Sequence, residues 1–275
     1  MRLANVGGRA SKVVEGGVVD IAEATGGAFG PDLASCIAQI DAVAAAMAGV
    51  DGPVAAMDER LLGPPSPDPG QIIAIGMNYA SHAEEMGLEV PTMPAAFAKF
   101  RSALTGPVGE ISLPSDTVDY EVELVLVIGR RTEVVTPQNA WDHVAGITAG
   151  QDFSERTVQM AAGRQFALGK SYPGFAATGP WMATLDEFAD PADVGLGCSI
   201  DGVVVQDARS SDMIIKVPEL LTILSGIITL EPGDLLYTGC PSGVGMGKVP
   251  PTYLRPGQQL VTWVESVGEM RHTMA

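Results

Sequence analysis

The sequence predicts a mainly β fold with a few helices, of the α+β class. Glycine and proline are frequent, with 33 and 20 residues among 275, which predicts many turns and therefore many short strands. Asp201-Gly202 separates two apolar runs within residues 198–206, a pattern typical of a two-residue β-hairpin. Only two or three stretches show a helical pattern, so we expect few helices.

The first residues combine short strands with one helix. Glycines separate short β-like pieces at residues 2–6, 11–15 and 18–22. Apolar side chains recur at helical spacing over residues 32–48, which predicts a single helix there.

A proline-rich segment follows this region and predicts a boundary. Residues 61–70 read Leu-Leu-Gly-Pro-Pro-Ser-Pro-Asp-Pro-Gly, which cannot form the interior of a helix and predicts a stiff linker. We therefore predict a small N-terminal α+β subdomain over residues 1–65 and a main domain over residues 66–275.

The main domain is predicted to contain further strands and two short helices. Asn78 can cap a brief helix that Gly87 ends, and Pro218 begins another that reaches Ser225. Strands are expected at residues 71–76, 124–128, 144–150 and 235–238, and a glycine-rich loop at 239–247.

An acidic stretch precedes the most apolar of these strands. Alternation along a strand places Asp119, Glu121 and Glu123 on one face, and residues 124–128 are apolar on both faces, as in a strand buried on both sides. The carboxylates are thus carried toward a core, where ionised groups without partners are costly. A hard divalent cation would remove that cost, so we predict a metal site, with a solvated strand edge as the alternative.

Composition limits the partners and the compartment. A formal net charge of −17 argues against a nucleic-acid or anionic-membrane partner, and requires a local positive group to attract an anionic substrate. The three cysteines are an odd number without zinc-type spacing, which favours a reducing compartment. No stretch has the pattern of a signal peptide or membrane span, so we expect a cytoplasmic protein.

Together these motifs resemble the fumarylacetoacetate hydrolase family over roughly residues 70–274. The resemblance implies a mixed β-sandwich roll with an acidic metal-binding triad, a homodimer, and action on 2-oxo or β-diketo acids. Its carriers are Ile75-Gly-Met-Asn-Tyr-Ala-Ser-His82-Ala-Glu-Glu85, Lys99-Phe, Gly106-Pro, Asp119-Tyr-Glu121-Val-Glu123-Leu, Gly150-Gln-Asp152-Phe-Ser-Glu-Arg156, Gly169-Lys170-Ser and residues 230–245.

The resemblance implies that Glu121, Glu123 and Asp152 bind one divalent cation. An all-oxygen, carboxylate-rich set favours Mg²⁺ or Mn²⁺ over zinc, with Ca²⁺ as a further candidate. Lys170 is available to balance the remaining negative charge. Taken alone, Asp152 could equally be a turn residue after a strand, and Asp119 matches no ligand position and is expected to support the ligands.

His82 and Glu85 are three residues apart and would lie on one face of a helix. With the resemblance, they are interpreted as a pair in which Glu85 orients the imidazole while its other nitrogen takes a proton from water. An incidental surface pair is the alternative. The resemblance also suggests that this helix closes over bound substrate.

Other residues are assigned by matched position. Lys170 is interpreted as a catalytic cation that holds a carboxylate or stabilises enolate charge, with a solvated lysine as the alternative. Thr238 and Gly239 are expected to line the substrate pocket, and Arg156 and Gln159 are further candidates for substrate binding.

Several residues depart from the family pattern or match nothing in it. Cys240 stands where the family more often has threonine; we interpret it as a small neutral replacement, because no histidine is predicted nearby. Met77 stands where leucine or arginine is more usual. His143 and His272 are interpreted as structural or surface residues.

The predicted function is divalent-metal-dependent hydrolysis of a C–C bond in a 2,4-dioxo acid, such as an acylpyruvate or a fumarylacetoacetate-like substrate. The His82–Glu85 pair favours this reaction because hydrolysis needs activated water. The alternatives on the same site are an oxaloacetate-type decarboxylase or a 2-hydroxy-diene-dioate isomerase or hydratase. A non-catalytic small-acid binding protein is an alternative of another class.

Overall fold

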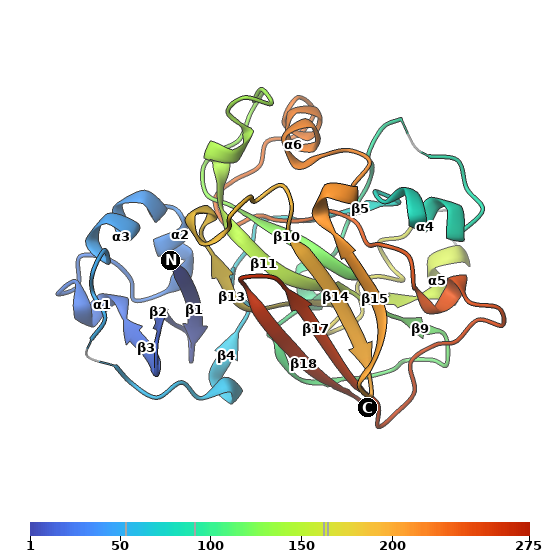
Figure 1. Cartoon of the computed structure of the whole chain (residues 1–275), viewed down its shortest axis with the longest axis horizontal. Coiled ribbons are helices and arrows are strands. Elements are labelled where there is room, and N and C mark those ends of the chain that lie inside the picture. Colours follow the sequence, from blue (N-terminus) through green and yellow to red (C-terminus); the bar gives the residue numbers. More distant parts are fainter. Residues whose placement is uncertain (53, 91, 162, 164) are drawn as a thin grey trace.

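Two β-sheets packed face to face form the centre of the computed structural model, which describes residues 1–52, 54–90, 92–161, 163 and 165–275 (Figure 1). In the larger sheet the strand order is β3 (Gly17–Asp20), β2 (Arg9–Val14), β1 (Arg2–Val6), β13 (Ala176–Ala183), β11 (Val144–Asp152), β10 (Val122–Ile128), β16 (Leu235–Tyr237), β5 (Ile72–Gly76) and β6 (Ala95–Ala98). In addition, β4 (Leu62–Gly63) pairs with β1, and β7 (Leu104–Thr105) pairs with β13.

The smaller sheet covers the middle of the larger one. Its order is β15 (Val203–Arg209), β14 (Gly195–Ile200), β17 (Gln259–Val264), β18 (Gly268–Met274) and β8 (Val108–Ile111). Strand β14 contacts β10, β17 contacts β11 and β18 contacts β13, which makes the two sheets a sandwich (Figure 1). A separate pair joins β9 (Val118–Asp119) to β12 (Ser154–Glu155).

Helices are short and lie around the sandwich. They are α1 (Ile21–Ala24), α2 (Leu33–Ile37), α3 (Ile40–Ala46), α4 (Ala80–Glu85), α5 (Arg156–Ala161) and α6 (Val217–Ser225). Short 3-10 turns are η1 (Glu59–Leu61), η2 (Arg101–Ala103), η3 (Ala140–His143), η4 (Leu185–Glu187), η5 (Ser210–Asp212) and η6 (Gly245–Gly247). The mainly β, mixed β-sandwich prediction is confirmed, although the short helices are more numerous than predicted.

The predicted hairpin is present between β14 and β15. Asp201 and Gly202 have φ values of 51° and 81°, the two left-handed residues that a type I′ turn requires. By contrast, the single helix predicted over residues 32–48 is wrong. Helix α2 packs on β1 and β2 whereas α3 packs on α2, so the chain changes direction between them.

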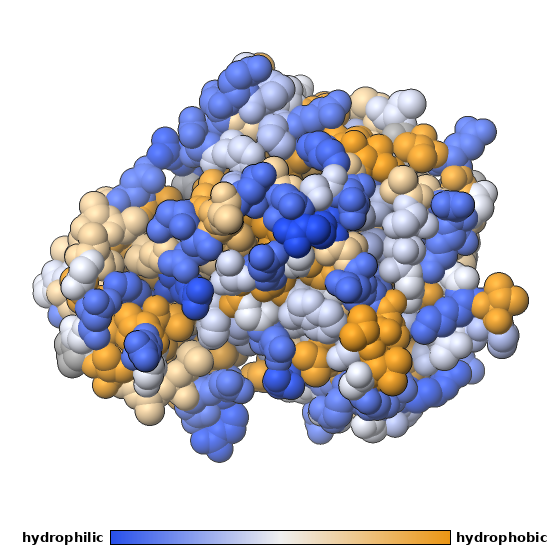
Figure 2. Space-filling view, viewed as in Figure 1, coloured by the Kyte–Doolittle hydropathy of each residue, from blue (hydrophilic) through white to orange (hydrophobic). Residues whose placement is uncertain are grey.

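The N-terminal region extends the larger sheet, because Arg2 and Leu3 of β1 pair with Ala183 and Met182 of β13. The division at residue 65 stays a prediction. Figure 2 shows polar and apolar residues interspersed over one face of the molecule, with the apolar ones in separate patches. Among the described residues, no helix has the length and apolar character needed to cross a membrane.

The centre of the larger sheet determines where the functional residues meet. Every residue of β10 is buried, as its apolar run predicts. Strand β16 lies between β10 and β5, antiparallel to the first and parallel to the second. Parallel strands end at the same edge of a sheet, so the segments that follow β5 and β16 emerge side by side. These segments are α4 and the glycine-rich loop 239–247.

Asn78 lies between these two segments. The prediction that it caps α4 is wrong. The N-cap residue is Tyr79, which makes no side-chain cap hydrogen bond. The buried Asn78 amide instead donates to the carbonyls of Ile215 and Thr238 and accepts from the Ile215 N–H. An amide carries donors and an acceptor together, and here satisfying three buried backbone groups outweighs local capping.

Candidate active site

Three carboxylates meet at the ends of β10 and β11. Glu121 immediately precedes β10, Glu123 lies within it, and Asp152 is the last residue of β11. The antiparallel register pairs Val122 with Gln151, which brings these strand ends together. One oxygen from each carboxylate lies within 4.8 Å of one from each of the others, and all three residues are buried.

Two buried lysines neutralise part of this charge. Lys170 Nζ donates to Glu121 Oε2 over 2.6 Å and to Asp152 Oδ2 over 2.5 Å. Lys99 Nζ donates to the other oxygen of Asp152 and to the Lys170 carbonyl. The Lys99-Phe motif marked this lysine, but no role was predicted for it. It comes from the loop after β6, and its partner lies 53 positions further along the chain.

Close backbone packing at Gly169 places Lys170. A Cβ added to Gly169 would stand 2.5 Å from the backbone nitrogen of Gln159, so a larger residue would push this segment away from α5. The glycine of the Gly169-Lys170-Ser171 motif is thus explained by the close approach of its backbone to that of Gln159.

The carboxylates differ in how well neighbouring cationic and N–H groups offset their negative charge. Burial raises the pKa of Glu123, and the neighbouring Asp152 and Glu121 raise it further. Burial also disfavours the charged form of Glu121, but Lys170 and Arg156 outweigh it and hold the pKa of that carboxyl below its ordinary value. Among the described groups, Glu123 accepts one hydrogen bond, from the Gly239 N–H at 2.6 Å. Glu123 is therefore the carboxylate with the greatest need of a further cation.

The donor set fits a hard divalent cation. Carboxylate oxygens from three residues converge, and one of them is under-compensated in the protein alone. Buried within this region are four carboxylates and three cationic side chains, so a divalent ion leaves a net positive site suited to an anionic substrate. The charged residues are Asp119, Glu121, Glu123, Asp152, Lys99, Lys170 and Arg156.

Asp119 does not continue the face of Glu121 and Glu123, because the strand is interrupted between β9 and β10. Its carboxylate accepts from Arg156 Nε and Nη2 at 2.9 and 2.7 Å, and from the N–H groups of Gly245 and Met246. It therefore supports Arg156, which in turn contacts Glu121 Oε1 at 2.7 Å.

His82 and Glu85 face each other on α4. His82 Nδ1 and Glu85 Oε2 are 2.9 Å apart. The other carboxylate oxygen of Glu85 accepts the Gly243 N–H at 2.8 Å. Glu85 thus joins α4 to the glycine-rich loop while it orients the imidazole, and His82 is itself buried.

A cavity of about 430 Å³ lies over these groups. Its polar wall contains His82, Glu121, Arg156, Gln159 and Lys170. Gln159 accepts from Arg156 Nη1 at 2.9 Å, which orients its amide within the wall. The rest of the wall is mainly apolar and includes Ile75, Met77, Met86, Leu88, Phe97, Met160, Phe166 and Met246.

Thr238 and Gly239 lie behind this wall. The Thr238 hydroxyl donates to the Leu124 carbonyl at 2.8 Å, and the Gly239 N–H is used by Glu123. Neither is among the described residues that line the cavity. Gly239 has a φ of 103°, and a Cβ there would stand 2.6 Å from that of Asn78. These residues position the wall, whereas pocket lining had been predicted for them.

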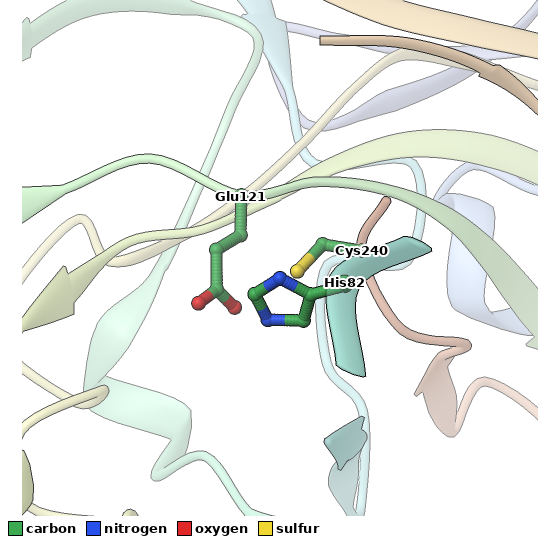
Figure 3. A group of neighbouring side chains, drawn as sticks. All are labelled: His82, Glu121 and Cys240. Carbon is green, nitrogen blue, oxygen red and sulfur yellow. The ribbon is translucent and has the colours of Figure 1, made fainter. Parts of the chain in front are cut away.

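Cys240 lies close to a histidine, contrary to the prediction that none would be near it. Its sulfur, a ring nitrogen of His82 and a carboxylate oxygen of Glu121 all lie within 4.8 Å of one another (Figure 3). Burial raises the pKa of the Cys240 thiol, and Glu121 and Glu123 raise it further, which keeps the thiol neutral. Sequence reasoning missed this proximity because it depends on the parallel pairing of β5 with β16.

His143 and His272 lie away from the cavity. His272 on β18 is buried, with Nε2 3.1 Å from the Gly106 carbonyl, and burial lowers its pKa to about 4. His143 lies beside Thr132 on the surface turn η3.

Known proteins share this fold and much of this sequence. Oxaloacetate tautomerase FAHD2A, mitochondrial, of Bos taurus is 41% identical over 203 residues, 73% of this chain and 65% of the tautomerase. The chain thus spans slightly less than two thirds of that relative. A "putative HpcE protein" from Mycobacterium smegmatis has a TM-score of 0.94 at 44% identity, with 100% of this chain and 99% of that one covered.

Maleylpyruvate hydrolase from Sphingobium sp. SYK-6, solved in complex with manganese(II) ion and pyruvate, has a TM-score of 0.82 at 29% identity. The alignment covers 100% of this chain and 99% of that one. The family model for the C-terminal region of fumarylacetoacetate (FAA) hydrolase matches residues 71–275. With most of its length matched, the chain belongs to the fumarylacetoacetate hydrolase family.

Proposed function

We propose that this protein is a divalent-metal-dependent hydrolase that cleaves a C–C bond in 2,4-dioxo acids of the acylpyruvate class. The observation that carries the proposal is the position of the His82–Glu85 pair beside the buried carboxylates, at a cavity lined by both charged and apolar side chains. A charged head and an apolar tail on one substrate would match both walls.

The proposed ligands are Glu121, Glu123 and Asp152, with Mg²⁺ or Mn²⁺ as the ion and Ca²⁺ as a further candidate. Such an ion supplies Lewis-acid stabilisation of negative charge on the oxygens of a 2-oxo acid. Lys170 and Arg156 hold Glu121 in place from two sides and add positive potential where the substrate carboxylate would bind. The manganese(II) and pyruvate bound by the maleylpyruvate hydrolase support this assignment.

In the proposed reaction His82 takes a proton from water, and the hydroxyl oxygen bonds to the C4 carbonyl carbon. The C3–C4 bond then breaks and its electron pair passes to the 2-oxo acid fragment. A proton returned to C3 gives pyruvate, and the C4 side leaves as a carboxylic acid. Glu85 holds the imidazole through Nδ1, so that the other ring nitrogen exchanges the proton.

The apolar wall favours a substrate with a tail. Four methionines line it, namely Met77, Met86, Met160 and Met246, and unbranched thioether side chains adapt to tails of different shape. Phe97 and Phe166 pack edge to face at a centroid distance of 5.7 Å, which gives this wall one rigid element. A four-carbon diacid would leave these residues without contacts.

A second candidate is tautomerisation or decarboxylation of a 2-oxo diacid such as oxaloacetate. The likeness to the bovine oxaloacetate tautomerase favours it. The same charged wall would bind that substrate, and tautomerisation needs a proton-transfer group but no attack by water. Isomerisation of a 2-hydroxy-diene-dioate would likewise need a proton-transfer group and no attack by water.

The test is product analysis with the full chain and a substrate panel. With Mn²⁺ or Mg²⁺ present, we expect acylpyruvates to yield pyruvate and the matching acid in equal amounts, measured by mass spectrometry. Oxaloacetate followed by absorbance distinguishes enol–keto exchange from loss of carbon dioxide. Activity on oxaloacetate without pyruvate release from any acylpyruvate would replace the hydrolase by the second candidate.

Two further proposals rest on the family assignment and on composition, respectively. The protein is proposed to act as a homodimer, which the mass in solution tests directly. A cytoplasmic site of action is proposed from composition and cysteine usage, and the predicted subdomain at residues 1–65 carries no identified chemistry.

A further inference from the structure

His82, Glu121 and Cys240 form a cluster. His82 and Glu121 each have a role in the reaction proposed above, but the cluster as a whole has none. Its members come from α4, the residue just before β10 and the loop after β16. They are 6%, 4% and 3% exposed, and their ligand atoms lie within 4.8 Å of one another. Figure 3 shows the Cys240 sulfur and the Glu121 carboxylate beside the His82 ring, with the three side chains coming from separate elements.

The donor chemistry differs from that of the carboxylate set. An imidazole nitrogen, a sulfur and one carboxylate oxygen form a mixed, softer set, which suits zinc-class ions and not magnesium. In a tetrahedral zinc site ligand atoms stand roughly 3.4–3.8 Å apart, given bonds of about 2.0–2.3 Å. Because the ligand atoms lie within 4.8 Å of one another, each separation needs to shorten by at most about 1.4 Å. Three protein ligands would leave the fourth position open toward the cavity.

The surroundings already orient two of the donors. Glu85 holds His82 Nδ1 at 2.9 Å, the carboxylate–histidine arrangement that commonly orients a zinc ligand. Arg156 and Lys170 use one acceptor position on each oxygen of Glu121. A carboxylate has about four such positions, so Glu121 can serve the carboxylate site and a second ion together.

We propose that His82, Glu121 and Cys240 form a second cation site that takes zinc-class ions and, when filled, stops proton transfer by His82. Binding converts the Cys240 thiol to a metal-bound thiolate and releases one proton to solvent. The bound ion occupies the imidazole lone pair that would otherwise accept a proton. This site goes beyond the proposed hydrolysis, and its occupation can be measured without substrate.

Cadmium is the probe for the first test, because a cadmium–thiolate bond absorbs in the ultraviolet. Full-length protein loaded with excess Mn²⁺ is titrated with Cd²⁺, and we expect one absorbing equivalent per chain. Cys240→Ser should lack this band. Cys198→Ser is the matched control, since Cys198 is also a buried free thiol and belongs to no metal-type cluster among the described residues. It should retain the band.

Zinc affinity provides the second test, measured by competition with a chromogenic chelator. Loss of a ligand in Cys240→Ser or Cys240→Ala should weaken binding by more than about 100-fold. Glu85→Gln, which removes only an orienting partner, should weaken it by about 10–100-fold. Zinc should also inhibit any turnover in the presence of excess Mn²⁺, and Cys240→Ser should relieve that inhibition relative to its own zinc-free rate.

Two results would overturn the proposal. One is a cadmium band of equal size in wild type and Cys240→Ser; the other is unchanged zinc affinity in both Cys240 variants. The thiolate band reports metal binding by Cys240 alone. It therefore tests the second site even if the protein does not catalyse the proposed hydrolysis. A protein that turns over no acylpyruvate but shows the Cys240-dependent band keeps the second site and loses the first proposal.

Discussion

The two sides of the cavity are built on different parts of the fold. The carboxylates stand at the ends of β10 and β11, adjacent strands in the middle of the larger sheet and buried throughout. The His82–Glu85 pair stands on α4, a six-residue helix without a side-chain N-cap that is held to loop 239–247 through Glu85. A rigid sheet suits ion binding, whereas a short helix on a loop suits a group that must move or exchange protons. The two functions should therefore separate on mutation.

Glu123→Gln is expected to have the largest effect on turnover. It removes the least compensated carboxylate, so bound Mn²⁺ and activity should both fall, the latter by roughly 10³-fold or more because a metal contributes several kcal/mol. Thermal stability of the metal-free protein should hold or rise, since a costly buried group is gone. Calorimetry with Mn²⁺ and melting curves check both, with Glu110→Gln, at an exposed side chain of β8, as the control. Unchanged manganese affinity would remove Glu123 from the ligand set.

His82→Ala addresses the other side of the cavity. We expect acylpyruvate hydrolysis to fall by about 10²–10⁴-fold, the usual contribution of a general base, while Mn²⁺ affinity stays at the wild-type value. Decarboxylation of oxaloacetate should be largely spared, because it needs no activated water. His143→Ala, at a histidine distant from the cavity, is the matched control. An equal loss of both activities would give His82 a role other than water activation.

Glu85→Gln should have a smaller effect of the same kind. The substitution keeps the size of the side chain but weakens its hold on His82 Nδ1 and on the Gly243 N–H. A loss of about 10–100-fold in kcat is expected, which is typical when the orienting partner of a functional histidine is removed. Steady-state kinetics with an acylpyruvate measures it; a loss as large as that of His82→Ala would make Glu85 itself a reacting group.

His272→Asn should leave turnover nearly unchanged and alter acid stability instead. The folded protein keeps His272 neutral, with a pKa lowered to about 4 from 6.5, while the unfolded chain is protonated below the higher value. Its contribution is thus present above pH 6.5 and is lost as the pH falls toward 4, by up to about 3 kcal/mol. The variant should flatten the dependence of unfolding free energy on pH in that window. A slope equal to wild type would contradict the pKa assignment.

Local patterns were enough to predict much of this molecule. Alternation and apolar content identified β10, the Asp-Gly dipeptide identified the β14–β15 hairpin, and spacing placed His82 against Glu85. Each of these depends on residues near in sequence, for which period and turn chemistry are informative.

The features that the sequence did not predict depend on contacts between segments that are distant in the chain. Lys99 reaches Asp152 from a loop, and Cys240 meets His82 only because β16 inserts beside β5. Asp119 leaves the acidic face because Arg156 and the N–H groups of residues 245–246 bind it more completely than a continued strand would. The role of Asn78 likewise follows from partners more than 130 positions away.

The parallel pairing of β5 with β16 has a consequence for how the protein is made. Residues 72–76 can pair with β6 early, but they join β10 only through residues 235–237, so the sheet closes only after most of the chain has been synthesised. Until then the carboxylates of β10 and β11 have no imidazole beside them. A nascent chain released early would carry the acidic residues without His82 in place to take a proton from water. The appearance of activity should therefore coincide with completion of the fold.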